Sequence, residues 1–332
     1  MKRFALTAVL VAASLSPAYG GAADATAAPA LPDAKPVPRM QAVPQPYDQV
    51  SFRRGGTEIA RVHFGPGLRR PFVFPVVGPA GRSLTRMGHP HDPVTHSHHN
   101  SVWISHHDVD GVNFWADHGR NLGTIVHQRV ERLEDAADEA AVQALNHWVG
   151  PQGKVRLAER RRVAVRPMEG REWLMLVDLE FAAPAADRPA TFNVNPFGLL
   201  GVRMAKTIGI HDGGGTIRNS EGQRDEKGPN GCFRKPARWC DYSGPIAPGT
   251  VEGVTLMDHP SNVNHPTPFH VRGDGWMGAC LTLEKPVEVT AERPLRLRYG
   301  LWIHAGLPTA DAIEQIWKPF AATKVAPLKA KR

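Results

Sequence analysis

Five histidines lie within twelve residues of the segment "HSHHNSVWISHH": His96, His98, His99, His106 and His107. A neutral imidazole takes up or releases a proton near pH 7, and it is also a common metal ligand. The run therefore predicts a histidine site that either performs acid/base chemistry or holds a divalent metal ion. The alternative is a histidine-rich loop at a sheet edge, in which each ring is hydrogen-bonded and has no chemical role.

The pair best suited to a metal ion is His96 and His98. On a strand their side chains would share one face about 6.6 Å apart, and imidazole nitrogens bind Zn²⁺ at about 2.0–2.1 Å. His98 and His106 cannot share an ion on a straight strand, because eight residues span about 26 Å. A third ligand would have to come from another strand. The candidates for it are His127, Asp258 and His259.

We expect one concave sheet face to carry the whole site. The catalytic candidates come from the histidine run, the segment after it and "MDHPSN": His98, His99, His106, His127, Asp258 and His259. Polar and aromatic side chains in nearby strands and turns are expected to bind the substrate: Asn100, Trp103, Asp108, Trp115, Asn195, Arg203, Asn262 and His270. Tryptophan rings, including Trp239 and Trp276, could stack on a sugar ring, although tryptophan at strand spacing more often packs in a core.

The elements that must position these residues are mostly strands. In "EWLMLVDLEF" and "PLRLRYGLWIH" alternate apolar residues share one face, as they do in a strand with one buried side. "TIVHQRVERL" and "KVRLAERRRVAVRP" are two further strand candidates with charged outer faces. Many short strands, 30 Pro and 32 Gly predict an all-β fold, a large antiparallel β-sandwich.

One hairpin and one helix stand out against this pattern. Asp110-Gly111 between two valines predicts a two-residue hairpin, which would pair His107 with Phe114 and His106 with Trp115. "LPTADAIEQIWKPF" predicts a C-terminal helix capped by Thr309, packed on the sheet edge.

The two ends of the chain differ in composition from the body. Residues 1–20 combine a basic start, an apolar run and small residues, which is typical of a cleaved signal peptide; a short membrane anchor is the alternative. Residues 21–46 are rich in Ala and Pro and predict an extended linker, 47–325 a single β-sandwich domain, and 326–332 a frayed basic tail. We therefore expect a secreted or periplasmic protein.

Export limits the partners and the thiol chemistry. The formal charge is +8, but Lys and Arg are scattered among Asp and Glu, so we expect no nucleic-acid partner and no stable membrane span. Cys232 and Cys240 would either close a short disulfide loop or remain buried thiols, and the odd count of three leaves at least one cysteine unpaired. Nothing in the sequence predicts an oligomeric state.

Several common catalytic motifs are absent from the sequence. It has no G-x-S-x-G elbow, no G-x-x-x-x-G-K phosphate loop and no H-E-x-x-H. A serine hydrolase, an NTPase and a zincin are therefore disfavoured.

An ordered series of segments resembles the DUF6807 family: "HSHHNSVWISHHDVDGVNFW", "GTIVH", "FGLLGVRMA", "IRNSEG", "RWCDYSG", "MDHPSNVNHPTPFHV" and "YGLWIHAG". The resemblance runs from about Arg70 to Phe320. The family's usual H-P-H-H-R-G/S becomes "HSHHNS" here, so Asn100 replaces an arginine and a role that needs a cation at that position is not carried over. Residues on the family's recurrent positions are His106, Asp108, Gly111, Phe114, Trp115, His127, Arg203, Asp258, His259, Pro260 and Asn262.

The resemblance implies an exported β-sandwich, similar in architecture to the galactose-mutarotase-like supersandwich of bacteria that degrade polysaccharides. The family's other label, methane-oxygenase A-like, refers to a multi-helix membrane protein and does not suit this chain. We expect a carbohydrate-active enzyme that acts on a glycoside or a modified sugar by hydrolysis, elimination or epimerisation, with a histidine as acid or base and a divalent metal as an optional cofactor. A non-catalytic sugar-binding module and a metal-binding exported protein are the alternatives.

Overall fold

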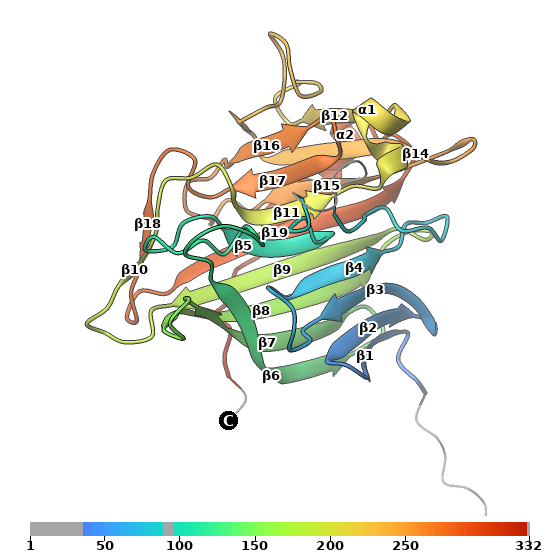
Figure 1. The fold of residues 1–332 in the computed structure, drawn as a ribbon. Helices are drawn as coiled ribbons and strands as arrows, with labels where there is room; N and C mark the ends of the chain where they lie inside the picture. The colour runs from blue at the N-terminus through green and yellow to red at the C-terminus, as the bar shows by residue number, and fades with distance from the viewer. Residues whose placement is uncertain (1–35, 89–95, 331–332) are drawn as a thin grey trace, which may run out of the picture. The chain divides into compact units, whose positions relative to one another are not determined.

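The computed structural model describes residues 36–88 and 96–330, and the compact unit begins at Pro38 (Figure 1). The predicted antiparallel sandwich is confirmed, with two large sheets and a C-terminal helix. The predicted signal peptide, residues 1–20, lies outside the described residues. No helix in the described part of the chain is long and apolar enough to cross a bilayer.

The first sheet has nine strands in the order β1-β2-β3-β4-β5-β11-β17-β16-β13. Their bounds are β1 Met40–Gln45, β2 Gln49–Arg54, β3 Thr57–His63, β4 Phe72–Val76, β5 Val102–His106, β11 Gly198–Arg203, β17 Trp276–Cys280, β16 Pro268–Arg272 and β13 Lys235–Pro236. Every pairing in this sheet is antiparallel.

The second sheet has eight strands in the order β12-β14-β15-β19-β9-β8-β7-β6. Their bounds are β12 Thr216–Asn219, β14 Trp239–Ala247, β15 Thr250–Asp258, β19 Leu295–Ala305, β9 Trp173–Ala182, β8 Val155–Pro167, β7 Ala140–Val149 and β6 Thr124–Asp135. A two-stranded sheet, β10 (Ala190–Phe192) and β18 (Val287–Val289), completes the strands of the described residues.

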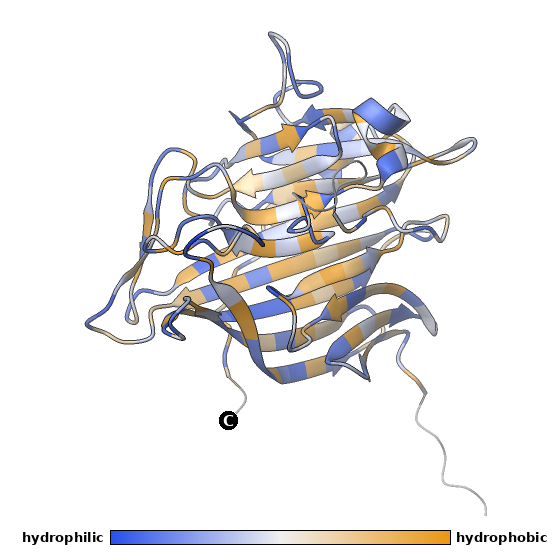
Figure 2. Cartoon of the chain, in the orientation of Figure 1, coloured by the Kyte–Doolittle hydropathy of each residue, from blue (hydrophilic) through white to orange (hydrophobic). Residues whose placement is uncertain are grey.

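The main core lies between the two large sheets. Val102 and Ile104 of β5 enter it from the first sheet, and Val177 and Leu179 of β9 enter it from the second. Figure 2 shows apolar and polar residues alternating along many of the strands. The two-residue period puts one apolar face of each sheet into this core and leaves the other face for different contacts.

The C-terminal helix α2 (Ala310–Ala321) begins as predicted, because the side chain of Thr309 accepts a hydrogen bond of 3.2 Å from the Ala312 N–H. Its position at the sheet edge was predicted wrongly. Ile313 and Phe320 pack with Met257 and Trp302, residues of β15 and β19 in the middle of the eight-stranded sheet. The apolar side chains on the outer face of these strands would be exposed to water without the helix, and the apolar stripe of the helix buries them. Two short helices, η1 (Lys206–Ile208) and α1 (Ile210–Gly213), connect β11 to β12.

Both ends of the predicted domain need correction. Met40–Gln45, assigned to the linker, form β1, since Met40 and Ala42 point inwards at alternate positions and Pro44 lies on an edge strand. The tail is not wholly frayed: the Leu328 N–H donates to Glu180 at 3.3 Å, and the Lys329 carbonyl accepts from Gln143 at 2.9 Å.

The Asp110-Gly111 turn and the three cysteines can be compared with their predictions. The turn at Asp110-Gly111 is confirmed by positive φ at both residues and by the Val109–Val112 bridge, but the hairpin extends no further. The Phe114 N–H donates to the carbonyl of His106, not of His107, because β5 already pairs with β4 and β11 on its two sides. The cysteines Cys232, Cys240 and Cys280 are all free and buried, so the disulfide alternative is not seen.

Candidate functional site

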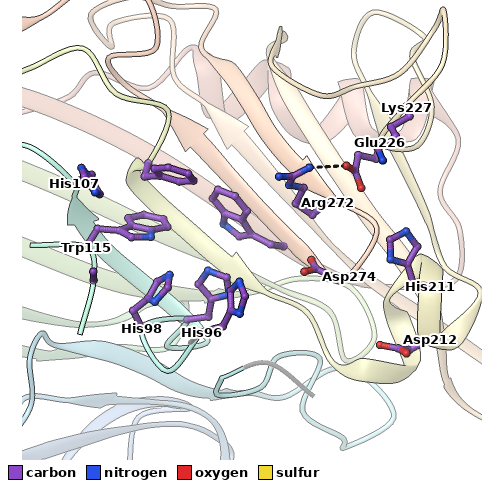
Figure 3. A pocket seen from close by; sticks show the side chains of 14 residues that line it. His96, His98, His107, Trp115, His211, Asp212, Glu226, Lys227, Arg272 and Asp274 are labelled. Atoms are coloured by element: carbon purple, nitrogen blue, oxygen red, sulfur yellow. Dashed lines mark hydrogen bonds and ion pairs between the residues drawn. The ribbon is translucent and has the colours of Figure 1, made fainter. Parts of the chain in front are cut away.

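A pocket of about 680 Å³ lies on the outer face of the nine-stranded sheet. Its lining residues come from loops and strand ends that are far apart in sequence: His96, His98, His99, His107, Trp115, Ala116, Phe197, His211, Asp212, Glu226, Lys227, Arg272, Asp274 and Trp276. Figure 3 shows His96, His98, His107 and Trp115 on one side of this pocket, and the charged side chains together with His211 on the other. We call these the aromatic half and the charged half.

Two glycines let the floor of the aromatic half lie flat. Gly201 pairs with Trp103 on one side and with Gly278 on the other. A Cβ on Gly201 would lie 2.6 Å from Trp103 Cζ2, and a Cβ on Gly278 would lie 3.3 Å from Trp276 Nε1. Because no side chain rises from these positions, both indoles can lie across the sheet. The ring of His99 then stacks on Trp103 and Trp276 at centroid distances of 5.3 and 5.6 Å.

One buried arginine joins two walls of the pocket. Arg70, 2% exposed, donates to Asn100 Oδ1 at 2.6 Å, to the Trp115 carbonyl at 2.8 Å and to Asp117 Oδ1 at 2.7 Å. Asp117 also accepts from the hydroxyl of Ser97 at 2.8 Å. Arg70 therefore ties the histidine turn to the segment that carries Trp115. Asn100 helps to position the turn, and its contact with a substrate stays a prediction.

Burial keeps His98 and His99 of the pocket neutral. It lowers the pKa of His98 to about 4, with the Arg70 charge adding to the effect. Burial and then His98 hold the pKa of His99 well below its usual value. The ring centroids of His96, His98 and His99 lie 4.4 to 5.9 Å apart. At neutral pH the rings of His98 and His99 therefore offer lone pairs and N–H groups without charge.

The charged half is built on the ends of β16 and β17 and on two connections beside them. Arg272 Nη1 pairs with Glu226 Oε1 at 2.9 Å, as drawn in Figure 3. Asp274, in the turn between β16 and β17, accepts from Arg203 Nη1 at 2.8 Å. His211 and Asp212 reach the pocket from α1.

The structure brings together only some of the predicted site residues. His96, His98, His99 and Trp115 line the pocket. Trp103 and Arg203 lie beneath it on the same sheet face, and His270 packs against Trp276 at 4.0 Å.

His106 was expected in this site but faces the opposite side of its strand. It is fully buried, its Nε2 lies 2.7 Å from Thr282 Oγ1, and its ring contacts Phe192 edge-on at 5.2 Å. Val102, Ile104 and His106 share the core side of β5, whereas Trp103 faces the pocket.

His127, Asp258, His259 and Asn262 belong to the other sheet and its loops, so their placement on one face with His98 was wrong. His127 stacks on Phe64 at 4.5 Å and reaches Asn146 at 3.3 Å. His259 contacts Ser261 at 2.8 Å and the Thr323 carbonyl at 2.9 Å.

Asp258 organises a separate loop behind β15. Its carboxylate accepts from Asn262 at 2.7 Å, from the Thr267 N–H at 2.9 Å and contacts His265 Nδ1 at 2.7 Å. The strand order that separates this loop from the histidine turn cannot be read from residue spacing.

Two other predicted contacts act as supports. Asp108 Oδ1 accepts from the Gly111 N–H at 2.8 Å and from Asn193 at 2.9 Å, which anchors the tight turn. Asn195 lies 3.2 Å from His107 Nδ1 and accepts from the Phe197 N–H at 2.9 Å. Asn195 thus holds two residues that line the pocket.

The predicted metal pair lacks its proposed third ligand. Of His127, Asp258 and His259, none lines the pocket of His96 and His98. Within the described residues, no group of three or more His, Cys, Asp or Glu side chains is arranged to hold a metal ion. The His96–His98 ligand pair stays a prediction.

The sequence analysis missed much of the charged half and the residue that ties the walls together. These residues are Arg70, His211, Asp212, Glu226, Lys227, Arg272 and Asp274, and Phe197 of the aromatic half was missed as well. The "GIHDGGG" stretch carries a signal for His211 and Asp212, since a histidine and an aspartate precede three glycines.

The fold and the pocket define a class of mostly β proteins, antiparallel sandwiches with a ring-lined pocket on the outer face of one sheet. The chain belongs to the DUF6807 family, a family of unknown function whose model matches residues 49–318. No curated protein matches the chain.

Proposed function

We propose that this protein is an exported carbohydrate-active enzyme, and that the pocket binds a glycoside or a modified sugar on which a histidine acts as acid or base. The observation that carries the proposal is the pairing of aromatic faces with uncharged imidazoles in one pocket. Its volume of about 680 Å³ lies within the usual range for small-molecule sites.

The aromatic half supplies the binding surface. Trp115 lies 5.7 Å from Trp276 and 5.8 Å from Phe197, centroid to centroid, so three rings border one space. A sugar ring has an apolar C–H face and a polar rim. The rings would stack on that face, while the histidines would exchange hydrogen bonds with the hydroxyl groups.

His98 is the best candidate for the proton-transfer group. Neither of its ring nitrogens has a hydrogen-bond partner within the described part of the chain. Because its pKa is lowered to about 4, the ring is neutral at pH 7 and can accept a proton from a sugar C–H or from an attacking water. In an alternative version, His96 and His98 hold a divalent metal that polarises a sugar oxygen.

A non-catalytic sugar-binding module is the second candidate. It is favoured by the state of two carboxylates in the pocket, since Glu226 is paired with Arg272 and Asp274 with Arg203. Most glycoside hydrolases need one carboxyl group as acid and a second as base or nucleophile, and these two are already engaged.

The deciding experiment is product analysis after incubation with a panel of oligosaccharides and aryl glycosides. We expect the unmodified protein to release or convert a sugar, the His98→Gln variant to lose at least about 100-fold in rate, and a control, His147→Gln, to keep the rate. His147 lies on β7 in the eight-stranded sheet, outside the pocket. Binding without product would favour the binding module, and full activity in His98→Gln would exclude His98 as the acid/base group.

A further inference from the structure

In the charged half of the pocket, the carboxylates of Glu226 and Asp274 are paired with arginines, whereas a buried donor beneath it, Arg203 Nη2, has no partner among the described residues. We infer that the sugar bound there carries an oxyanion, a carboxylate or a sulfate group, seated against Arg272 and Lys227 with Arg203 beneath. This inference rests on the proposed function, because it names the class of sugar that the same pocket takes.

The acceptors of the charged half are already occupied. Glu226 Oε1 accepts a hydrogen bond from Arg272 Nη1 at 2.9 Å, and its Oε2 accepts one from the Gly273 N–H at 2.8 Å. Burial opposes its charge, but these two partners outweigh burial and lower the pKa of Glu226, so it is a carboxylate at neutral pH. Asp274 Oδ1 receives Arg203 Nη1. The charge of each of these two carboxylates is therefore already balanced by an arginine.

The donors are not all used. Arg203 has a fully buried side chain, and its Nη2 has no hydrogen-bond partner among the described residues. Its Nη1 donates to pocket-lining Asp274, its Nε donates to the Gly88 carbonyl, and its cross-strand neighbour is pocket-lining Trp276, so the guanidinium lies directly beneath the pocket lining. The indole N–H of Trp276 is also buried and has no partner among the described residues. Buried donors of this kind are normally satisfied, and an oxyanion offers the acceptors that the protein does not.

The charges give the same answer. Among the described residues, the cations Lys227 and Arg272 line this half together with the carboxylates Asp212, Glu226 and Asp274, and the cations Arg203 and Arg86 lie near those carboxylates outside the lining. Burial and then the neighbouring Arg203 lower the pKa of Arg86 to about 10, which still leaves it charged at pH 7. One added negative charge would balance the set, because oppositely charged groups in a partly buried site attract strongly.

Exposure decides which cations can meet the ligand first. The Arg272 side chain is 45% exposed and uses Nη1 for Glu226. Lys227 is next to Glu226 on the same loop and lines the pocket. Both are therefore placed at the mouth, while Arg203 and Arg86 act from below.

The test is calorimetric titration with four sugars: glucose, glucuronic acid, galacturonic acid and glucose 6-sulfate. We expect at least one acidic sugar to bind about tenfold or more tightly than glucose, with an affinity that falls as salt is raised. A preference for the uronic acids would identify a carboxylate, and a preference for the sulfate ester would identify a sulfated sugar.

Variants locate the effect. Arg272→Gln with Lys227→Gln should weaken binding of the acidic sugar much more than binding of glucose, so that the preference is lost, and Arg296→Gln should leave both affinities unchanged. The Arg296 side chain is 41% exposed and pairs with Glu180 in the other sheet, so Arg296→Gln also removes one surface ion pair but does so outside the pocket. Equal binding of glucose and the acidic sugars would overturn the inference and leave the proposed function standing. No binding of any of the four sugars would overturn both.

Discussion

At the scale of single residues, the pocket depends on groups that are neutral or paired for a physical reason. His98 is uncharged because it is buried beside Arg70, which disfavours a second positive charge. Gly201 is required by the flat indole of Trp103. The residue types of the histidine run were visible in the sequence, but their protonation depends on burial and on a charge from Arg70, which comes from a distant part of the chain.

The neutral state of His98 predicts the pH dependence of turnover. A general base acts when it is unprotonated, so the rate should hold at neutral pH and fall as the pH drops through about 4. In Arg70→Gln the repulsion is removed, and the acidic limb should move to higher pH. Rates of the unmodified protein and the variant between pH 3.5 and 7 test this. An acidic limb that stays in place in Arg70→Gln would show that another group titrates.

The flat floor predicts that Gly201 does not tolerate a side chain. Gly201→Ala would bring Cβ within 2.6 Å of the Trp103 ring and should destabilise the protein by about 1–3 kcal/mol. Gly67→Ala is the control, because nothing lies within 4 Å of a Cβ at that position. Urea unfolding of both variants measures the difference, and equal stability would mean that the indole moves aside at no cost.

At the scale of elements, the strands and the C-terminal helix could be predicted, whereas the neighbours of each strand could not. The two-residue period in Trp173–Ala182 and Leu295–Ala305 gives the buried face of β9 and β19 directly. This period does not predict that β5 pairs with β11 or that His127 lies in the other sheet. The predicted site therefore contained the correct histidine turn together with residues from a different layer.

Arg70 is the residue that fixes the positions of two loops, and its loss should loosen the pocket. Arg70→Met removes hydrogen bonds to Asn100, Trp115 and Asp117 and leaves a partly buried carboxylate unpaired, which should cost about 3 kcal/mol of the free energy of unfolding. Arg296→Met removes a partly exposed ion pair with Glu180 and should lower the free energy of unfolding by only about 0–1 kcal/mol. A similar small loss in both variants, measured by urea unfolding, would contradict the role given to Arg70.

At the scale of the whole molecule, a β-sandwich with many buried histidines is sensitive to acid. Burial lowers the pKa values of His98, His106 and His270 to about 4. Between the usual histidine pKa of about 6.5 and about 4, the unfolded chain binds protons that the folded protein does not. The free energy of unfolding should therefore fall as the pH is lowered through that window, by about 3 kcal/mol for a fully buried histidine.

His106 is the clearest contributor to this acid sensitivity because it is fully buried and outside the pocket. His106→Gln should lose less stability than the unmodified protein between pH 7 and pH 4.5, even if it is less stable at pH 7. The exposed His118→Gln should keep the original pH dependence. Denaturant unfolding at the two pH values checks this. If His106→Gln loses as much free energy of unfolding between pH 7 and pH 4.5 as the unmodified protein, the buried neutral state of His106 is contradicted.

The measurement that tests the central claim most directly is a fluorescence titration of the protein with neutral and acidic mono- and oligosaccharides, because Trp115 and Trp276 line the pocket. We expect a saturable change in tryptophan emission with at least one sugar, and its loss in Trp115→Ala but not in His147→Gln. No saturable change with any sugar, or a change that persists unaltered in Trp115→Ala, would contradict the assignment of this pocket as a sugar site.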